Sequence, residues 1–263
     1  KGEAPEMPFV KEPVPWEAQG YYYDPEARPG LHPYHEAGVY YLQEASAMAP
    51  VQLLDPQPGE WVCDLCAAPG GKTTQIAGRM GGEGFLLCNE WSPKRAKILS
   101  RNIERLGVAN ALVTNEETKR LAEKYPEQFD KVLIDAPCSG EGMFRKNAEE
   151  AYEEWSEENV AMCAERQAHI LNEATKMLAV GGRIVYSTCT FAMAEDELQV
   201  EKYLRTHPEM RLMKQEKYAD ALETVRSGQK LSDALHGRQL LFNEVVILER
   251  TGEYNAAYER AVE

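Results

Sequence analysis

The sequence predicts an α/β fold, in which a mostly parallel β-sheet carries helices on both faces. Short apolar runs typical of strands alternate along the chain with longer runs whose apolar residues recur every three or four positions, as in helices. A glycine turn, Gly70-Gly71, separates the first strand of this alternating region from its first helix. Strands and helices in regular alternation indicate a layered α/β domain.

The elements follow in order along the chain. Residues 1–35 are rich in Pro, Gly and Tyr and predict an extended arm, and residues 36–49 predict a short helix that Pro50 ends. Strands are expected at 61–65, 85–89, 111–114, 131–135, 183–188 and 244–250. Helices are expected at 72–80, 93–106, 116–124 and 157–179, the last capped by Ser156 and ended by Gly181-Gly182. Residues 211–240 give no clear pattern.

Composition restricts the class of protein. The 263 residues are 43% hydrophobic, enough to bury a real core, and no apolar run approaches the 18 residues of a membrane span. Six scattered cysteines and the lack of a secretory leader favour reduced thiols in the cytoplasm. A net charge of −14 argues against nucleic-acid affinity over the whole surface but leaves room for a local basic groove.

The stretch "CDLCAAPGGKT" (63–73) admits four interpretations. A zinc site lacks a second close pair of ligands, and a redox pair is disfavoured because Cys63 lies within a strand pattern, where we expect a core residue. A phosphate-binding loop lacks its first glycine, because Cys66 stands there, and Pro69 removes a backbone donor. The fourth interpretation is a cofactor-binding turn, with Glu90 after the next strand as the ribose-binding acid. A plain strand–helix turn remains open beside it.

Two further cysteines directly follow predicted strands. Cys138 lies in "DAPCSGEGMFRK" (135–146) and Cys189 in "STCTF" (187–191). Cys63, Cys88 and Cys163 fall within periodic patterns and are expected in the core. Since ligands bind beyond the carboxyl ends of parallel strands, two thiols at that edge suggest covalent catalysis.

"DLCAAPGGKT", "DAPCSGEG" and "STCTF", in this order, resemble the motifs of the Sun-type RNA (cytosine-5) methyltransferases. "PGLHPYHEAGVYYLQEASAMAP" is similar to the segment that precedes the cofactor loop in that family, and "GEGMFRK" is similar to its bacterial ribosomal-RNA branch, the RsmF type. The resemblance covers roughly residues 13–208 and implies a Rossmann-like class I methyltransferase with a mostly parallel seven-stranded sheet. We expect an N-terminal arm and short helix packing on the core (1–50), the methyltransferase domain (51–250) and a C-terminal tail (251–263).

The resemblance implies S-adenosylmethionine as the cofactor and assigns residues to it. The cofactor loop comprises Cys66, Ala67, Ala68, Pro69, Gly70, Gly71 and Lys72. Glu90 matches the ribose-binding acid, and Glu117, with Glu116 as the alternative, matches the acid near the adenine. The family more often has Asp at that last position. Asp135 matches a residue that lines both the cofactor and the target base.

The resemblance also implies the chemistry. Cys189 matches the nucleophile that adds to carbon 6 of cytosine, Cys138 matches the cysteine that assists release, and Asp135 could hold a proton to ring nitrogen 3. Lys72 either supports the thiolate or lies solvated at the start of its helix. The expected partner is RNA with a single-stranded or flipped cytosine, most simply 16S ribosomal RNA, with no metal, no membrane and a monomeric state.

Three points remain open at this stage. The cations Lys94, Arg95, Lys97, Arg101 and Arg105 favour a solvated helix face over an RNA contact, whereas Arg145-Lys146 fit either. The chain is expected to be a catalytic core without the N- and C-terminal RNA-binding parts of the RsmF type. The competing functions are a nucleotide hydrolase with a degenerate phosphate loop and a catalytically silent RNA-binding or assembly protein.

Overall fold

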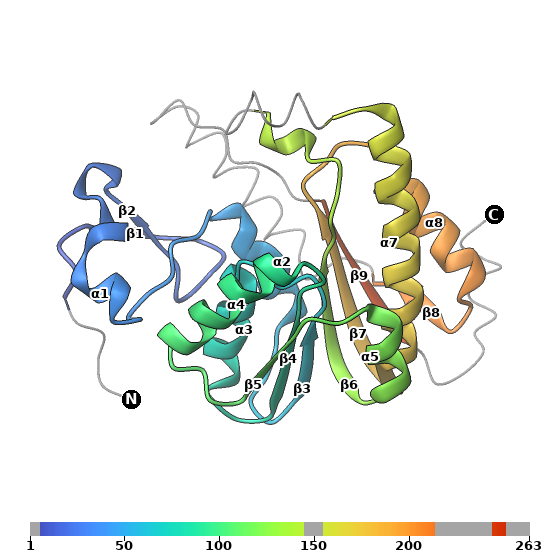
Figure 1. Ribbon diagram of the computed structural model, residues 1–263, viewed down its shortest axis with the longest axis horizontal. Coiled ribbons are helices and arrows are strands. Elements are labelled where there is room, and N and C mark those ends of the chain that lie inside the picture. The colour runs from blue at the N-terminus through green and yellow to red at the C-terminus, as the bar shows by residue number, and fades with distance from the viewer. Residues whose placement is uncertain (1–5, 145–154, 214–243, 251–263) are drawn as a thin grey trace.

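The computed structural model describes residues 6–144, 155–213 and 244–250 (Figure 1). Within these residues one large sheet has the strand order β5-β4-β3-β6-β7-β9-β8. Its strands are β3 (Trp61–Asp64), β4 (Phe85–Asn89), β5 (Ala111–Thr114), β6 (Phe129–Asp135), β7 (Leu178–Thr188), β8 (Met210–Leu212) and β9 (Glu244–Arg250). The first five pair in parallel, and β9 is antiparallel to β7 and β8. The mostly parallel sheet predicted from the sequence is confirmed.

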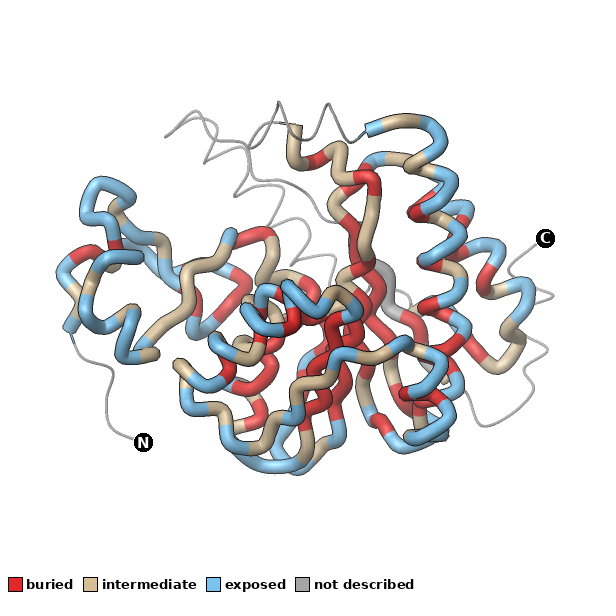
Figure 2. Tube along the Cα trace, viewed as in Figure 1, coloured by how far each residue is buried: buried red, intermediate tan, exposed pale blue. Residues whose placement is uncertain are grey.

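Helices cover both faces of this sheet (Figure 1). One layer contains α2 (Ala49–Leu54), α3 (Gly71–Met80) and α4 (Pro93–Arg105), and the other contains α5 (Thr118–Lys124), α7 (Glu157–Met177) and α8 (Glu197–Thr206). Each layer buries its own hydrophobic cluster against the strands, and Figure 2 shows the buried residues concentrated there. Helix α8 was not among the predicted elements.

Successive strand residues divide between the two clusters. In β3, Val62 packs toward α2, α3 and α4, whereas Cys63 packs toward α5 and α7. In β6, Leu133 belongs to the first cluster, and Val132 and Ile134 belong to the second. Strands covered on both faces therefore read as continuous apolar runs. The prediction that Cys63 is a core residue is confirmed, because its side chain is fully buried.

The sheet has a topological switch point between β3 and β6. From β3 the chain continues outward through β4 and β5, whereas β6 and β7 continue in the opposite direction. Crossover helices therefore leave in opposite directions and open a crevice beyond the carboxyl ends of β3 and β6. The cofactor-like turn and the Cys138 loop both begin at this crevice.

The prediction of one helix over residues 36–49 is wrong. The N-terminal segment begins with a hairpin of β1 (Val10–Pro13) and β2 (Tyr21–Tyr23). The short helix α1 (Pro33–Glu36) follows, and an irregular segment then leads to η3 (Ser46–Met48). Trp16 anchors the hairpin by donating its indole N–H to the carbonyl of Ala45 over 2.9 Å. Pro50 does not break a helix but lies in the first turn of α2, where a missing N–H has no cost.

The end of α7 also differs from the prediction. Ser156 caps its start as predicted, with Oγ accepting from the Asn159 amide over 3.0 Å. The helix ends at Met177, and Gly181-Gly182 do not end it but lie within β7. A register shift between β6 and β7 occurs here, and Gly181 has φ +82°, a conformation that favours glycine. Most of the unassigned region 211–240, and the predicted tail 251–263, lie outside the described residues.

Candidate active site

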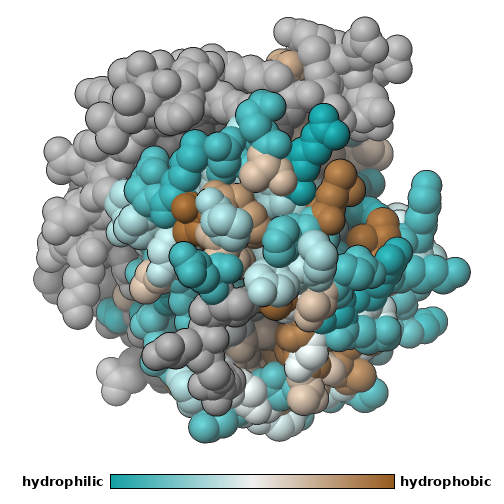
Figure 3. Space-filling view, turned by 90° about the vertical axis from the view of Figure 1, so that its left-hand side faces the viewer, coloured by the Kyte–Doolittle hydropathy of each residue, from teal (hydrophilic) through white to brown (hydrophobic). Residues whose placement is uncertain are grey.

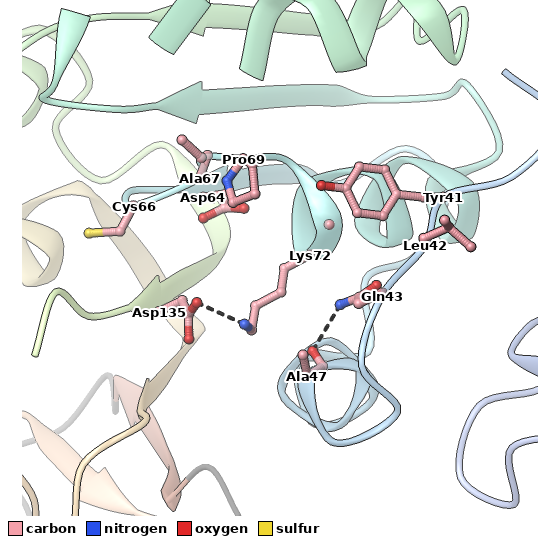
Figure 4. Close-up of a pocket in the computed structure, with 12 residues that line it drawn as sticks. Tyr41, Leu42, Gln43, Ala47, Asp64, Cys66, Ala67, Pro69, Lys72 and Asp135 are labelled. Atoms are coloured by element: carbon pink, nitrogen blue, oxygen red, sulfur yellow. Dashed lines mark hydrogen bonds and ion pairs between the residues drawn. The ribbon is translucent and has the colours of Figure 1, made fainter. Parts of the chain in front are cut away.

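A cavity of about 910 Å³ lies beyond the carboxyl ends of the parallel strands. The loops after β3, β4, β5, β6 and β7 all contribute to its wall, so the five loops predicted to form the site do meet. We call it the large cavity. A smaller cavity of about 210 Å³ shares Cys66, Ala68 and Asp135 with it and lies between residues 66–72 and residues 41–47 (Figure 4).

The predicted cofactor loop divides between these cavities. Cys66 and Ala68 line both, and Ala67, Pro69, Gly71 and Lys72 line the smaller one. Gly70 lines neither, but its φ of +116° turns the chain into α3. A β-carbon on Gly71 would lie 3.1 Å from the Tyr41 ring. The glycines thus serve a left-handed turn and a close approach, as predicted.

Lys72 is not solvated at its helix start. Its Nζ lies 2.7 Å from Oδ2 of Asp135, and only 13% of the lysine side chain is exposed (Figure 4). The other Asp135 oxygen accepts a hydrogen bond from Ser187 Oγ over 2.9 Å. The ion pair and this hydrogen bond link the start of α3 to the ends of β6 and β7. Lys72 therefore pairs with a carboxylate in place of the phosphate that it would bind in a phosphate-binding loop.

Asp64, the last residue of β3, is buried behind the loop. Thr73 donates to its Oδ2 over 2.7 Å, whereas its Oδ1 has no hydrogen-bond partner among the described residues. Burial raises the pKa of Asp64 to about 7, and nearby Asp135 adds to the increase. A buried carboxylate oxygen without a donor, at the wall of the smaller cavity, is suited to a ligand that brings a hydrogen-bond donor or a positive charge.

Glu90 lies where the sequence predicted a ribose-binding acid. It is buried at the wall of the large cavity, and its Oε1 accepts from the Ser92 amide over 2.9 Å. Its Oε2 lies 3.5 Å from Arg95, which is held in turn by the carbonyl of Ala68. Both candidates for the adenine-proximal acid, Glu116 and Glu117, also line the large cavity, so its geometry does not choose between them.

The two predicted catalytic cysteines are in contact. The Sγ atoms of Cys138 and Cys189 lie 3.2 Å apart, and the Cys189 amide donates to the Cys138 sulfur over 3.4 Å. The hydrogen bond from the Cys138 thiol, assisted by the charge of Lys72, lowers the pKa of Cys189. The same bond, together with burial, raises the pKa of Cys138. These two shifts favour a thiolate on Cys189 and a proton on Cys138.

Further hydrogen bonds join the two cysteine loops. The Gly142 amide donates to the Cys189 carbonyl over 2.8 Å, and the hydroxyls of Ser139 and Thr190 are 2.9 Å apart. Glu141, in η4 (Glu141–Met143), accepts from the Phe191 amide over 3.0 Å. The loops after β6 and β7 therefore form one hydrogen-bonded unit.

A buried carboxylate, that of Glu195, holds this hydrogen-bonded unit from the protein interior. Glu195 is fully buried, and its oxygens accept from the Ser139 amide at 3.1 and 3.4 Å and from Gln167 Nε2 at 2.7 Å. Gln167, also fully buried, donates to the carbonyl of Pro137 over 3.0 Å. Glu195 and Gln167 thus hold the backbone on both sides of Cys138.

Sequence reasoning missed three residues of the site. Gln167 lies on the apolar face of α7, and a polar residue on such a face is a signal that could have revealed it. Trp91, 70% exposed at the wall of the large cavity, directly follows Glu90 and could have been found by its position. Glu195 lies in the acidic run "AEDE", which gives no sign that the side chains of Glu195 and Asp196 are buried.

A family model described as 16S rRNA methyltransferase RsmB/F matches residues 51–240, and one described as the N-terminal domain of 16S rRNA methyltransferase RsmF matches residues 3–45. The chain belongs to the RsmB/F methyltransferase family. The resemblance seen in the sequence is thus confirmed at the level of the family. The two matches cover residues 3–45 and 51–240, and β9 lies beyond them.

Curated relatives agree with this assignment. Ribosomal RNA small subunit methyltransferase F of Salmonella heidelberg and that of Salmonella paratyphi A are each 42% identical over 228 residues, which cover 84% of this chain and 45% of the relative. The chain therefore spans less than half the length of these relatives.

Solved structures show the same fold. A methyltransferase homologue from Pyrococcus horikoshii has a TM-score of 0.67 and 31% identity, covering 78% of this chain and 64% of that one. NSun6 from the same organism, solved with SFG, has a TM-score of 0.68 and 26% identity, covering 85% of this chain and 56% of that one. The Rossmann-like methyltransferase fold predicted from the motifs is confirmed.

Proposed function

We propose that this chain methylates carbon 5 of cytosine in RNA, most simply 16S ribosomal RNA, through a covalent adduct with Cys189. The observation that carries the proposal is the 3.2 Å contact between Cys138 and Cys189 at the wall of the large cavity. Membership of the RsmB/F family supports the substrate class. No comparable feature favours a nucleotide hydrolase or a silent assembly protein.

The cofactor is S-adenosylmethionine, and the site fits it. The large cavity, at about 910 Å³, has room for a ligand of this size, and the buried Glu90 carboxylate at its wall can accept from ribose hydroxyls. Glu117, or its neighbour Glu116, reaches the cavity from the loop after β5. The turn from Cys66 to Lys72 brings backbone close to the other end of the ligand. When bound, this cofactor supplies an electrophilic methyl group.

The two thiols have different roles because their pKa values shift in opposite directions. Carbon 5 of cytosine is a poor nucleophile until the Cys189 thiolate adds to carbon 6 and makes the ring enamine-like. After the methyl group has moved to carbon 5, a water molecule takes the carbon-5 proton. The electron pair of that C–H bond re-forms the double bond between carbons 5 and 6, and the bond between sulfur and carbon 6 breaks with its electron pair returning to Cys189. The Cys138 thiol, already hydrogen-bonded to that sulfur, stabilises the departing thiolate.

Asp135 and Lys72 complete the arrangement. Asp135 lines both cavities, and its carboxyl can hold a proton to ring nitrogen 3 as charge develops there. Lys72 keeps this carboxyl in place over 2.7 Å and places a positive charge near the Cys189 thiolate. A base must leave any stack to reach these groups, which favours single-stranded or flipped cytosine. Within the described residues, no helix has the length and apolar character of a membrane span.

Labelled S-adenosylmethionine with bulk ribosomal RNA, followed by mapping of the modified base, tests this function. Cys189→Ala should abolish methyl transfer, and Cys138→Ser should leave protein covalently joined to RNA on a denaturing gel. Cys163→Ala is the matched control, because this cysteine is buried in α7 and does not line the large cavity. Methyl transfer that survives both substitutions would overturn the mechanism.

A further inference from the structure

Helix α4 concentrates positive charge in a chain whose net charge is −14. Its cations Lys97, Arg101 and Arg105 recur every four residues, so they lie on one face of the helix. Figure 3 views the molecule from the side of the N-terminal segment, where hydrophilic side chains predominate over scattered hydrophobic ones. A local basic feature on such an acidic chain is the kind that an RNA hypothesis requires.

These three cations line a cavity of about 400 Å³ between α4 and α1. We call it the basic groove. Its wall comprises His35, Glu36, Lys97, Ile98, Arg101, Asn102 and Arg105. The helix face that the sequence favoured as solvated is exposed at Lys97 and Arg101, and it also forms one wall of a concave site.

The positive charge of the groove is poorly compensated by its own residues. Like charges four residues apart destabilise a helix. The one carboxylate in the wall, Glu36, lies 3.9 Å from Arg101, and both side chains are at least 75% exposed, so solvent weakens the pair. Arg105 donates to the carbonyls of His35 and Tyr40, which orient the guanidinium but carry no charge. An anionic ligand would supply the missing compensation.

The pKa of His35 also reflects the positive charge of the basic groove. Burial lowers the pKa of this imidazole below its ordinary value, and the nearby charge of Arg105 lowers it further. His35 is therefore largely neutral near pH 7 and can donate or accept a hydrogen bond beside the cations.

Helix α4 contributes to both the active site and the basic groove, from roughly opposite faces. Arg95, in the first turn of α4, lines the large cavity that also contains Cys138 and Cys189. From Lys97 to Arg105 the helix then rises by about 12 Å. An RNA strand whose flipped base occupies the large cavity would therefore cross over α4 to reach the basic groove.

We propose that the basic groove binds backbone phosphates of the RNA that flank the target cytosine. This proposal rests on the proposed function and identifies the face over which the strand leaves the active site. Three of the seven wall residues are cations and none is Phe, Tyr or Trp, so the groove is suited to neutralising phosphate rather than to stacking bases. The contact is consequently independent of sequence and sensitive to salt.

The test compares two doubly substituted chains that lose the same charge. Lys97→Ala with Arg101→Ala removes two of the three cations of the basic groove. Lys202→Ala with Arg205→Ala removes two exposed cations from α8, which packs on the other face of the sheet. Binding to a fluorescein-labelled twelve-residue oligocytidylate is followed by anisotropy from 50 to 200 mM salt. Calorimetry with S-adenosylmethionine checks that each chain is folded.

We expect the groove variant to bind about tenfold more weakly at 100 mM salt, with a slope of log affinity against log salt that is shallower by about 1.4. The α8 variant should stay within about twofold of the parent. Equal changes in both variants, no change in either, or no binding by the parent at 50 mM salt would overturn the proposal. If the basic groove binds an acidic protein in place of RNA, neither variant should differ from the parent in RNA binding.

Methyl transfer by the parent chain is measured separately, so the two proposals can fail independently. Active transfer with unaltered binding by the groove variant overturns the groove alone. Groove-dependent binding by a parent that transfers no methyl group to any RNA overturns the proposed activity alone.

Discussion

Substitution of Glu195 tests whether the buried carboxylate positions Cys138 for release. Glu195→Gln preserves the shape of the side chain but replaces one acceptor oxygen by a donor. Both partners of this carboxylate, the Ser139 amide and Gln167 Nε2, are themselves donors. Both short bonds go to Oε2, so a glutamine oxygen at that place can keep them. The new amide N–H group then replaces Oε1, so the Ser139 amide loses its second acceptor at 3.4 Å and faces a fully buried donor that has no acceptor.

The magnitude follows from that loss. A buried donor left without its partner costs about 1–3 kcal/mol, so the urea midpoint should fall by an amount equivalent to about 2 kcal/mol. If about two thirds of this cost appears as misplacement of the Cys138 loop, turnover falls by roughly tenfold, since about 1.4 kcal/mol corresponds to one factor of ten. The step that slows should be release, because Cys138 is the thiol next to the held backbone.

The assay measures three quantities on the same variant: urea unfolding, methyl transfer in a single turnover, and the fraction of protein joined to RNA on a denaturing gel. Glu197→Gln, an exposed residue two positions further along, is the control. We expect the adduct to accumulate in the Glu195 variant while cofactor affinity stays unchanged. A variant that loses stability but keeps parental turnover and forms no additional adduct would refute the positioning role.

Two further predictions concern titration. Cys138→Ala removes the hydrogen bond that lowers the Cys189 pKa, so the pH profile of iodoacetamide alkylation at Cys189 should shift to higher pH; a shift to lower pH would contradict the assigned direction. Asp64 has a folded-state pKa of about 7, above its unfolded value of about 3.9, so the folded state binds the extra proton between these values and stability should fall as pH rises from 4 to 7. Asp64→Asn should flatten that fall in urea unfolding, and an unchanged slope would show that Asp64 does not cause it.

The sequence predicted the parts of this fold that depend on local pattern. Apolar runs located the strands of the large sheet except β8. The glycine turn and the two cysteine loops located the candidate site, because the carboxyl ends of parallel strands meet at one edge. Family motifs then assigned roles that no pattern of spacing could give.

Other features depend on contacts between distant residues. Residues 36–49 have helix-like composition, yet Arg105 binds the carbonyls of His35 and Tyr40 and holds the chain in an irregular path. The Lys72–Asp135 pair joins residues 63 positions apart, and Glu195 is buried only because the Ser139 amide and Gln167 face it. Local propensity contains no information on such partners.

The pairing of β6 with β7 constrains how the active-site segments can change in length. Asp135 lies opposite Ser187 in parallel register, and each cysteine follows its strand end after a fixed short interval. An inserted or deleted residue within 135–138 or 187–189 would move one sulfur relative to the other by about the 3.3 Å rise of a strand residue, comparable to their whole separation. These two intervals should therefore tolerate substitution at their non-reactive positions far better than any change in length, whereas exposed turns such as Gly107–Asn110 should accept insertions.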